Sequence, residues 1–286
     1  AVCGTSRDAQ MSSFQNLVRL GIRDRVQLES MSLTDFRSVL QVLTKIKPDE
    51  IYNLAGQSSV GLSFNQPVET LESIATGTLN LLEAIRFIGA PIKFYSAGSG
   101  ECFGDTGDTA ADEMTPFRPR SPYAVAKATA FWEVANYREA YGLFACSGIL
   151  FNHESPLRPT RFVTQKIIAA ARRIAGGDTE PLKLGNLAVK RDWGWAPEYV
   201  EAMYLMLQQE QPDDFVIATG ASYTLEEFVK TAFEAVGLDW KSHVEIDKSL
   251  FRPTDLAGGL GNPTKAKIKL GWQAHYQMPD VVRMMV

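Results

Sequence analysis

The fold and the chemistry of this chain are indicated by one stretch, Ser121–Lys127, which reads SPYAVAK. Tyr123 and Lys127 are four residues apart, and on a helix this spacing places both side chains on one face. An ammonium group beside a phenol favours the phenolate, which is the stronger base. The pair can therefore take a proton from a substrate hydroxyl while hydride leaves the same carbon. Taken alone, the spacing also fits an ordinary helix with an exposed lysine and a half-buried tyrosine.

Two further polar residues lie upstream of this stretch. The segment Ile92–Ser96 predicts a short buried strand, which runs into a loop of small residues. The loop carries the hydroxyl of Ser99, and the carboxylate of Glu101 follows two residues later. An alternative interpretation is that Glu101 is only a carboxylate at the end of a strand, where it faces water. We predict four candidate catalytic residues: Ser99, Glu101, Tyr123 and Lys127.

Composition narrows the class of protein. A chain of 286 residues can bury a substantial core, as one large domain or as two intimately joined ones. The net charge of -4 argues against a general nucleic-acid binder. Three scattered cysteines indicate reduced thiols and a cytoplasmic protein, and no cysteine or histidine cluster suggests a metal. No apolar run approaches membrane-spanning length, and no signal peptide is visible.

Further motifs follow in order along the chain, and together they resemble the extended short-chain dehydrogenase/reductase superfamily. The closest resemblance is to the GDP-mannose 4,6-dehydratase family in its sugar-nucleotide branch. Several independent motifs in the right order are more specific than any one alone, and the resemblance covers nearly the whole chain. The residues that carry it are Glu101, Pro119–Tyr123, Phe151–Pro156, Arg191–Gly194 and Arg252–Thr254.

The resemblance implies an α/β fold, with a Rossmann-like doubly wound parallel sheet and a smaller α/β C-terminal substrate-binding domain. It places the dinucleotide-binding domain at residues 1–151 plus 193–218, and the sugar-nucleotide-binding domain at 152–192 plus 219–286. Val2–Thr5 corresponds to the second strand of such a fold, and no Gly-rich phosphate motif occurs near it. We therefore expect the first βα unit to be absent from this sequence. The alternative is a true variant without the loop, which would bind cofactor badly.

The cofactor is predicted from the end of this strand. An arginine there accommodates the 2′-phosphate of NADP, whereas an acidic residue binds the ribose hydroxyls of NAD. Arg7 favours NADP, and Asp8 keeps NAD possible; a solvated Arg7–Asp8 pair on a loop is the competing interpretation. The predicted cofactor-binding residues are Ser6, Arg7, Leu54, Ala55, Gly56, Tyr123, Lys127 and His153.

The substrate residues are implied mainly by the resemblance. A guanidinium group can bind a diphosphate through two parallel hydrogen bonds, so Arg191 and Arg252 are candidates, although both can equally be surface charges. Ser59 stands where the family has a histidine near the hexose, which leaves the sugar open. The predicted substrate-binding residues are Ser58, Asn152, Lys166, Asn186, Lys190, Arg191, Arg252 and Asp255.

The implied reaction is that of an NADP-dependent lyase that converts a GDP-hexose, GDP-mannose by resemblance, to a GDP-4-keto-6-deoxyhexose and water. Glu101 distinguishes this reaction, because an epimerase or a ketoreductase needs no acid/base for C5 and C6. The alternatives are a 4-ketoreductase, a GDP-mannoheptose dehydratase and an NAD-dependent nucleotide-sugar 4-epimerase. A non-catalytic nucleotide-sugar-binding protein is an alternative of another class. The resemblance also implies a homodimer or homotetramer, without nucleic-acid or membrane partners.

Overall fold

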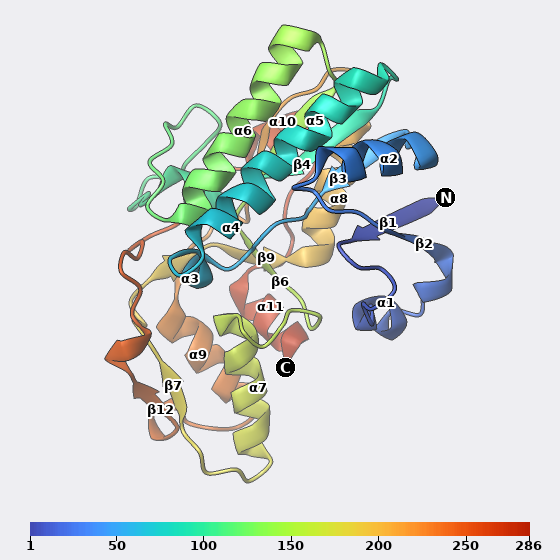
Figure 1. Ribbon diagram of the computed structural model, residues 1–286. Helices are drawn as coiled ribbons and strands as arrows, with labels where there is room; N and C mark the ends of the chain where they lie inside the picture. Colours follow the sequence, from blue (N-terminus) through green and yellow to red (C-terminus); the bar gives the residue numbers. More distant parts are fainter.

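The computed structural model describes residues 1–286, and it has two bodies (Figure 1). The upper body is a parallel sheet with helices on both faces, and the lower body holds the remaining helices and short strands. The helices are α1 (Gln15–Arg19), α2 (Phe36–Ile46), α3 (Val60–Ser63), α4 (Pro67–Leu71), α5 (Gly77–Ile88), α6 (Pro122–Tyr141), α7 (Val163–Ala175), α8 (Ala196–Leu207), α9 (Leu225–Glu234), α10 (Thr264–Leu270) and α11 (Met278–Met285).

The main sheet has four parallel strands in the order β10-β5-β4-β3. These strands are β3 (Glu50–Asn53), β4 (Lys93–Ala97), β5 (Ala145–Leu150) and β10 (Phe215–Ile217). Successive side chains of β4 enter opposite cores, since Phe94 packs with α2, α5 and α6 while Tyr95 packs with α8. The predicted α/β class, with a doubly wound parallel sheet, is confirmed.

Two more strands, β1 (Val2–Ser6) and β2 (Val26–Ser30), form a separate parallel pair with Val2 opposite Val26. No hydrogen-bond ladder joins them to the main sheet. Strand β1 lies where the resemblance placed a strand, at Val2–Thr5. The expectation about the first βα unit stays a prediction.

The ends of helix α6 are set by capping residues on both sides. The side chain of Ser121 caps its start by accepting a hydrogen bond of 3.1 Å from the backbone of Ala124. Pro122 occupies the first turn, where its missing N–H costs nothing. At the far end Gly142 adopts a left-handed conformation, with φ of 66°, and stops the helix. Tyr123 is therefore held in the first turn, at the end nearer the lower body (Figure 1).

The lower body is built around a core contributed by α7, α9 and α11, which includes Ile167, Phe228 and Val282. Short strands complete it: β6 (Asn152–Glu154) pairs with β9 (Trp193–Trp195), β7 (Leu182–Leu184) with β12 (Val244–Ile246), and β8 (Lys190–Arg191) with β11 (Tyr223–Thr224). Helix α11 was not predicted from the sequence.

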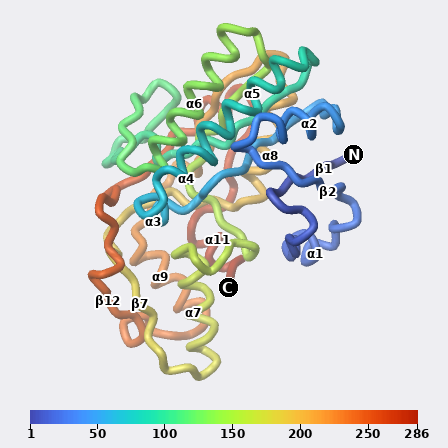
Figure 2. Tube along the Cα trace, viewed as in Figure 1, coloured from blue at the N-terminus to red at the C-terminus, as the bar shows by residue number.

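The C-terminal part of the chain crosses between the bodies more than once, as Figure 2 traces. Helix α10 packs against the sheet body, where Ala266, Leu270 and Trp272 join the core of Phe215. The chain then returns to the lower body and ends with α11. We therefore assign residues 264–272 to the sheet body, which refines the predicted range 219–286.

A buried carboxylate helps to hold the two bodies together. Asp192 accepts hydrogen bonds from the backbone of Thr219 at 2.9 Å, from its hydroxyl at 2.8 Å, and from the backbone of Gly220 at 2.9 Å. Burial raises the pKa of Asp192 to about 6, although these donors oppose the shift. The loop after β10 is thereby attached to the turn between β8 and β9.

No helix combines the length and the apolar character that crossing a bilayer requires.

We predict that the ion pair between Arg138 and Asp214 is important for stability. Its atoms are 2.6 Å apart, the side chains are only 19% and 11% exposed, and Asp214 also accepts from the backbone of Ser147. Arg138→Met leaves a buried carboxylate unpaired, and it should lower the free energy of unfolding by about 3 kcal/mol. The matched control Arg86→Met breaks an exposed pair and should cost at most about 1 kcal/mol. Urea titration measures both changes, and equal losses would contradict the prediction.

Candidate active site

The candidate site begins where β4 ends. Parallel strands present ligand-binding loops at their carboxyl ends, and Ser99 and Glu101 lie on the loop that follows β4. The oxygen of Ser99 accepts a hydrogen bond of 3.3 Å from the backbone of Glu101 and caps a 3-10 turn, Gly100–Phe103. Ser99 is buried, and Glu101 keeps part of its carboxylate accessible. The hydroxyl and the carboxylate are thus fixed relative to each other.

Helix α6 brings the other two predicted catalytic residues to this loop. The ammonium group of Lys127 donates a hydrogen bond of 2.7 Å to the carbonyl of Ala97 and lies 5.9 Å from the ring centre of Tyr123. The side chain of Ser99 lies near the phenol of Tyr123 and acts to lower its pKa. Three of the predicted catalytic residues therefore form one cluster, with Glu101 on the same loop.

Burial dominates the titration of this cluster. It raises the pKa of the Tyr123 phenol, and the nearby side chain of Ser99 opposes this only in part. Burial also lowers the pKa of Lys127 to about 8. From the spacing we expected the ammonium group of Lys127 to favour the phenolate, but burial raises the pKa of Tyr123, and the positive charge that acts to lower it is that of Arg158.

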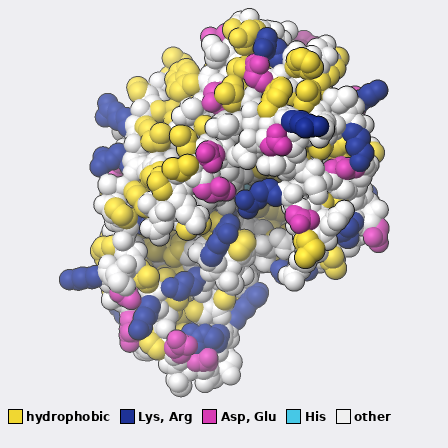
Figure 3. All heavy atoms as spheres, viewed as in Figure 1, with side chains coloured by type: hydrophobic (Ala, Val, Ile, Leu, Met, Phe, Trp, Pro, Cys, Tyr) yellow, Lys and Arg dark blue, Asp and Glu magenta, His cyan; other side chains and the backbone are white.

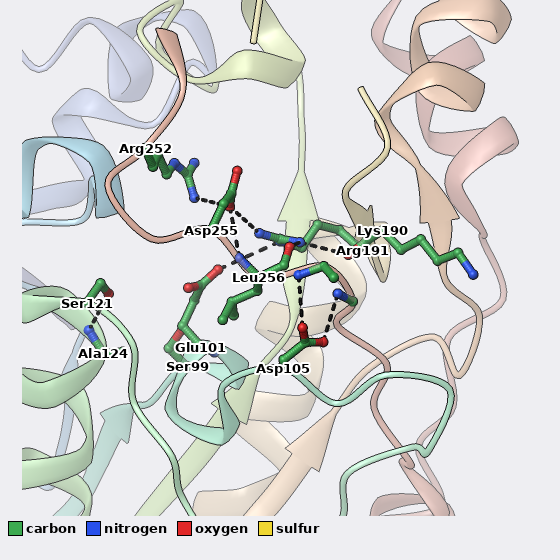
Figure 4. A network of polar contacts seen from close by, with 12 residues as sticks. Ser99, Glu101, Asp105, Ser121, Ala124, Lys190, Arg191, Arg252, Asp255 and Leu256 are labelled. Atoms are coloured by element: carbon green, nitrogen blue, oxygen red, sulfur yellow. Dashed lines mark hydrogen bonds and ion pairs between the residues drawn. The ribbon is translucent and has the colours of Figure 1, made fainter. Parts of the chain in front are cut away.

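A chain of charged side chains leads from Glu101 into the lower body (Figure 4). Arg191 lies with its Nε 3.8 Å from an oxygen of Glu101 and its Nη2 3.2 Å from Asp255. Arg252 lies 3.5 Å from the same oxygen of Asp255. Three of the predicted substrate residues thus form one chain of ion pairs, in which Arg191 is the member that approaches Glu101.

His153 has a fixed and neutral side chain. Its Nδ1 lies 2.9 Å from the carbonyl oxygen of Phe151, and its ring stacks on Tyr199 with 4.7 Å between the ring centres. Burial lowers the pKa of His153 to about 4, so the imidazole is uncharged at neutral pH. The neighbouring Asn152 is half-buried at the start of β6.

The remaining predicted cofactor residues lie at the end of β1 and on the loops that follow β1 and β3. Arg7 has a side chain that is 83% exposed, and only Glu69, 3.6 Å away, approaches it. Ser6 is hydrogen-bonded to Ser12 at 3.2 Å. Gly56 has a φ of 111°, a conformation that side chains rarely adopt, and Leu54 before it is exposed. An exposed guanidinium group and an exposed loop with a glycine, both at the carboxyl ends of parallel strands, fit a dinucleotide.

The other predicted substrate residues make no hydrogen bond or ion pair with the four catalytic candidates. Lys166 donates to the carbonyl of Lys183 and lines a cavity of about 440 Å³ between α7 and β7. Asn186 is exposed and accepts from its own loop at Ala188. Lys190 lies 3.7 Å from Asp108. Ser58 is placed by Arg161, which donates to it at 3.4 Å.

The sequence interpretation missed two arginines, Arg158 and Arg161. Both guanidinium groups lie over the ring of Phe162, at 4.0 and 5.0 Å. Arg158 also pairs with the buried Glu154 at 3.0 Å, and its charge acts on the phenol of Tyr123. Figure 3 shows lysine and arginine side chains gathered over the junction of the two bodies. The available signal was a pair of arginines directly after a strand-end polar motif.

Comparison with known proteins places this geometry in a family. The model of the GDP-mannose 4,6 dehydratase family matches residues 1–285. GDP-mannose 4,6 dehydratase 1 of Arabidopsis thaliana is 53% identical over 265 residues, which cover 91% of this chain and 73% of the relative. The human GDP-mannose 4,6 dehydratase is 43% identical over 284 residues, which cover 93% of this chain and 76% of the relative.

Solved structures share the fold. UDP-glucose 4-epimerase of Thermus thermophilus, in complex with NAD, is 26% identical with a TM-score of 0.85, covering 99% of this chain and 89% of that one. RMD of Pseudomonas aeruginosa, complexed with NADPH, is 22% identical with a TM-score of 0.80, covering 99% and 95%. The expected resemblance is thus confirmed over the whole chain, and the protein belongs to the GDP-mannose 4,6-dehydratase family.

Proposed function

We propose that this chain is a GDP-mannose 4,6-dehydratase, which converts GDP-mannose to GDP-4-keto-6-deoxymannose and water. The observation that carries the proposal is the position of Glu101, two residues after Ser99 and on the same capped turn. The names of relatives at 43% and 53% identity support it. Such a reaction needs one base at O4 and a separate acid/base at C5 and C6.

The O4 proton is assigned to Tyr123. Its phenol lies near the side chain of Ser99, so both groups can contact the same substrate oxygen. Lys127 places its positive charge beside the phenol and holds the first turns of α6 against the end of β4. Loss of the O4 proton to Tyr123 accompanies loss of hydride from C4, which leaves a ketone.

A nicotinamide dinucleotide would be held by Ser6, Arg7, Leu54, Ala55, Gly56, Tyr123, Lys127 and His153. When bound, the oxidised ring supplies a hydride acceptor for C4, a hydride donor for C6, and a positive charge near the phenol. We propose NADP, because the exposed guanidinium group of Arg7 is suited to a 2′-phosphate. NAD remains the alternative, and the fold neighbours include complexes with NAD and with NADPH.

Glu101 performs the elimination. The C4 ketone acidifies the C5–H bond, so the carboxylate of Glu101 can take that proton. The same proton then leaves with the C6 hydroxyl as water, which opens a double bond between C5 and C6. C6 regains the hydride that left C4, and C5 regains a proton equivalent to the one that left O4. The sum of these steps is the loss of one water from the sugar, with no net oxidation or reduction.

Binding of the GDP-sugar is assigned to the lower body and its junction with the sheet. We propose that Arg252 meets the diphosphate, since its side chain is 35% exposed and only Asp255 pairs with it. The other proposed contacts are Ser58, Asn152, Lys166, Asn186, Lys190, Arg191 and Asp255. With 264–272 moved to the sheet body, the predicted division into a dinucleotide-binding and a sugar-nucleotide-binding domain stays part of the proposal.

We also propose a cytoplasmic homodimer or homotetramer. Helices α4, α5 and α6 expose large apolar side chains, which supports association of copies through this face. These side chains are Val68, Leu71, Leu79, Phe87, Val125, Trp132 and Tyr141.

A 4-epimerase is the second candidate, because the Thermus thermophilus neighbour with a TM-score of 0.85 is named UDP-glucose 4-epimerase. An epimerase needs the Ser99, Tyr123 and Lys127 set but no Glu101. Product mass separates the two, since dehydration removes one water and epimerisation leaves the mass unchanged. A 4-ketoreductase would consume cofactor, a mannoheptose dehydratase would act only on the larger sugar, and a binding protein would form no product.

The first test concerns Glu101. Glu101→Gln keeps the size of the side chain but removes the base, so product formation should fall at least about a hundredfold. Binding of cofactor and of GDP should stay within about twofold, because the variant leaves both contacts in place. Mass spectrometry of the sugar nucleotide and fluorescence titration of cofactor measure these effects. Undiminished water loss in the variant would refute the assignment.

The second test concerns Arg7. Arg7→Ser removes the proposed partner of the 2′-phosphate, so the Kd for NADP should rise about tenfold to a hundredfold, while the Kd for NAD changes little. Arg19→Ser, which removes an exposed arginine from α1, is the charge-matched control and should change neither value. An equal change for both cofactors would argue against NADP.

The third test uses the pKa of Lys127, which burial lowers from 10.5 to about 8. Between these values the unfolded chain binds a proton that the folded chain lacks, so Lys127 makes stability rise with pH in this window. Lys127→Met removes this contribution, and its free energy of unfolding should gain less between about pH 8 and about pH 10 than that of the wild type. Urea titrations at several pH values measure the difference, and parallel profiles would contradict a buried ammonium group. The variant should also lose most of its activity.

A further inference from the structure

The helical run that begins at Pro67 contains one wide turn. Helices α4 and α5 are joined without a break by five residues, Glu72–Thr76, which form a π-helical turn. A single π-turn between α-helical segments is rare and is found frequently at functional sites. Helices α4 and α5 run alongside α6, which carries Tyr123 (Figure 1). The contacts of the π-turn therefore bear on the geometry of the candidate site.

One set of contacts joins the π-turn to the loop that follows β3. The hydroxyl of Ser73 accepts a hydrogen bond of 3.1 Å from the backbone N–H of Gln57. The hydroxyl of Thr70, at the end of α4, accepts one of 3.1 Å from the side-chain amide of the same residue. Thr70 is fully buried, and Ser73 is half-buried. The backbone and the side chain of Gln57 are thus both bound by this helical run.

The loop also packs directly against the π-turn at Gly56. A methyl group added to Gly56 would lie 2.7 Å from a side-chain carbon of Ile74, which is closer than van der Waals contact allows. At the end of β3, the side chain of Asn53 donates a hydrogen bond of 3.1 Å to the hydroxyl of Thr78. That hydroxyl donates one of 2.7 Å to the carbonyl oxygen of Ile74. The loop is therefore attached to the helical run at its start, at Gly56 and at Gln57.

The same turn packs against the catalytic helix. Ile74 is only 2% exposed and forms a small apolar cluster with Ala126 and Ala130 of α6, and Tyr123 packs against this cluster. Two adjacent residues thus connect the two parts of the site, because Ser73 binds the loop while Ile74 contacts α6. The separation between the loop and Tyr123 is set by this dipeptide.

We infer that Ser73 is a positioning residue, which holds the loop Leu54–Gly56 in register with Tyr123; this inference rests on the proposed function. In that function the loop contacts the dinucleotide, and Tyr123 takes the O4 proton while hydride leaves C4. Both transfers occur around one carbon, so they need the loop and the phenol at fixed positions, and small displacements of reacting groups lower the rate steeply. Ser73 acts through Gln57 and contacts neither the substrate nor the cofactor.

The first measurement uses the full chain without any ligand. A hydrogen-bonded amide exchanges with solvent when its bond opens, so Ser73→Ala should speed deuterium uptake at the N–H of Gln57 at least about fivefold. Ser73→Thr keeps the hydroxyl and should stay within about twofold of the wild type. Thr76→Val removes an exposed hydroxyl from the same turn and is the matched control, which should leave uptake unchanged. Unchanged uptake in Ser73→Ala would overturn the inference.

The second measurement concerns binding and hydride transfer. In Ser73→Ala the Kd for NADP should rise about fivefold to tenfold, whereas the Kd for GDP should stay within about twofold. At saturating NADP and GDP-mannose, oxidation at C4, followed by the absorbance of reduced nicotinamide in a single turnover, should slow at least about fivefold. Ser73→Thr should restore both values. Thr70→Val should cause a smaller loss, because the Gln57 amide keeps its hydrogen bond of 2.8 Å to the carbonyl oxygen of Ser59.

Other results would overturn the inference. Equal weakening of NADP and GDP binding, with no recovery in Ser73→Thr, would make Ser73 a structural residue only. Unchanged NADP affinity and unchanged C4 oxidation in Ser73→Ala, despite faster exchange at Gln57, would show that the hydrogen bond does not position the loop for the reaction. If Ser73→Ala does not fold, Thr70→Val gives the same comparison. A wild type that binds no NADP, or removes no water from GDP-mannose, would refute the proposed function itself, whereas the exchange measurement tests the Ser73 contact independently of it.

Discussion

The hydrogen bond from Lys127 to the carbonyl oxygen of Ala97 is the interaction on which the candidate site depends. It joins α6 to the end of β4 at 2.7 Å. A buried ammonium group must satisfy its donors inside the protein, so the helix cannot slide along the strand. Because Tyr123 lies one turn earlier on the same face, this bond also determines where its phenol meets Ser99.

The junction of the two bodies depends on adjacent residues that point in different directions. Arg191 faces the catalytic loop at Glu101, whereas Asp192 accepts three hydrogen bonds from Thr219 and Gly220 after β10. A single dipeptide thus connects the carboxylate after β4 with the loop that leaves the main sheet. We expect a small shift between the two bodies to move Glu101, because Arg191 and Asp192 are both buried.

Much of the fold could be predicted from local patterns. The apolar run Ile92–Ser96 predicted β4, and the spacing of Tyr123 and Lys127 predicted a helix with both side chains on one face. Helix α11 was missed because its short amphipathic segment follows an irregular stretch, and its burial depends on α7 and α9. The short strands of the lower body have partners far along the chain, which no local pattern indicates.

By itself the sequence determined the chemical groups, their spacing on α6 and the family to which the chain belongs. Only the tertiary structure decided which of those groups meet. It placed Arg191 against Glu101, brought Arg158 near Tyr123, and reversed the expected shift of the Tyr123 pKa. The reason is physical, since spacing along a helix is local, whereas burial and long-range charge pairing depend on every element that packs around a side chain.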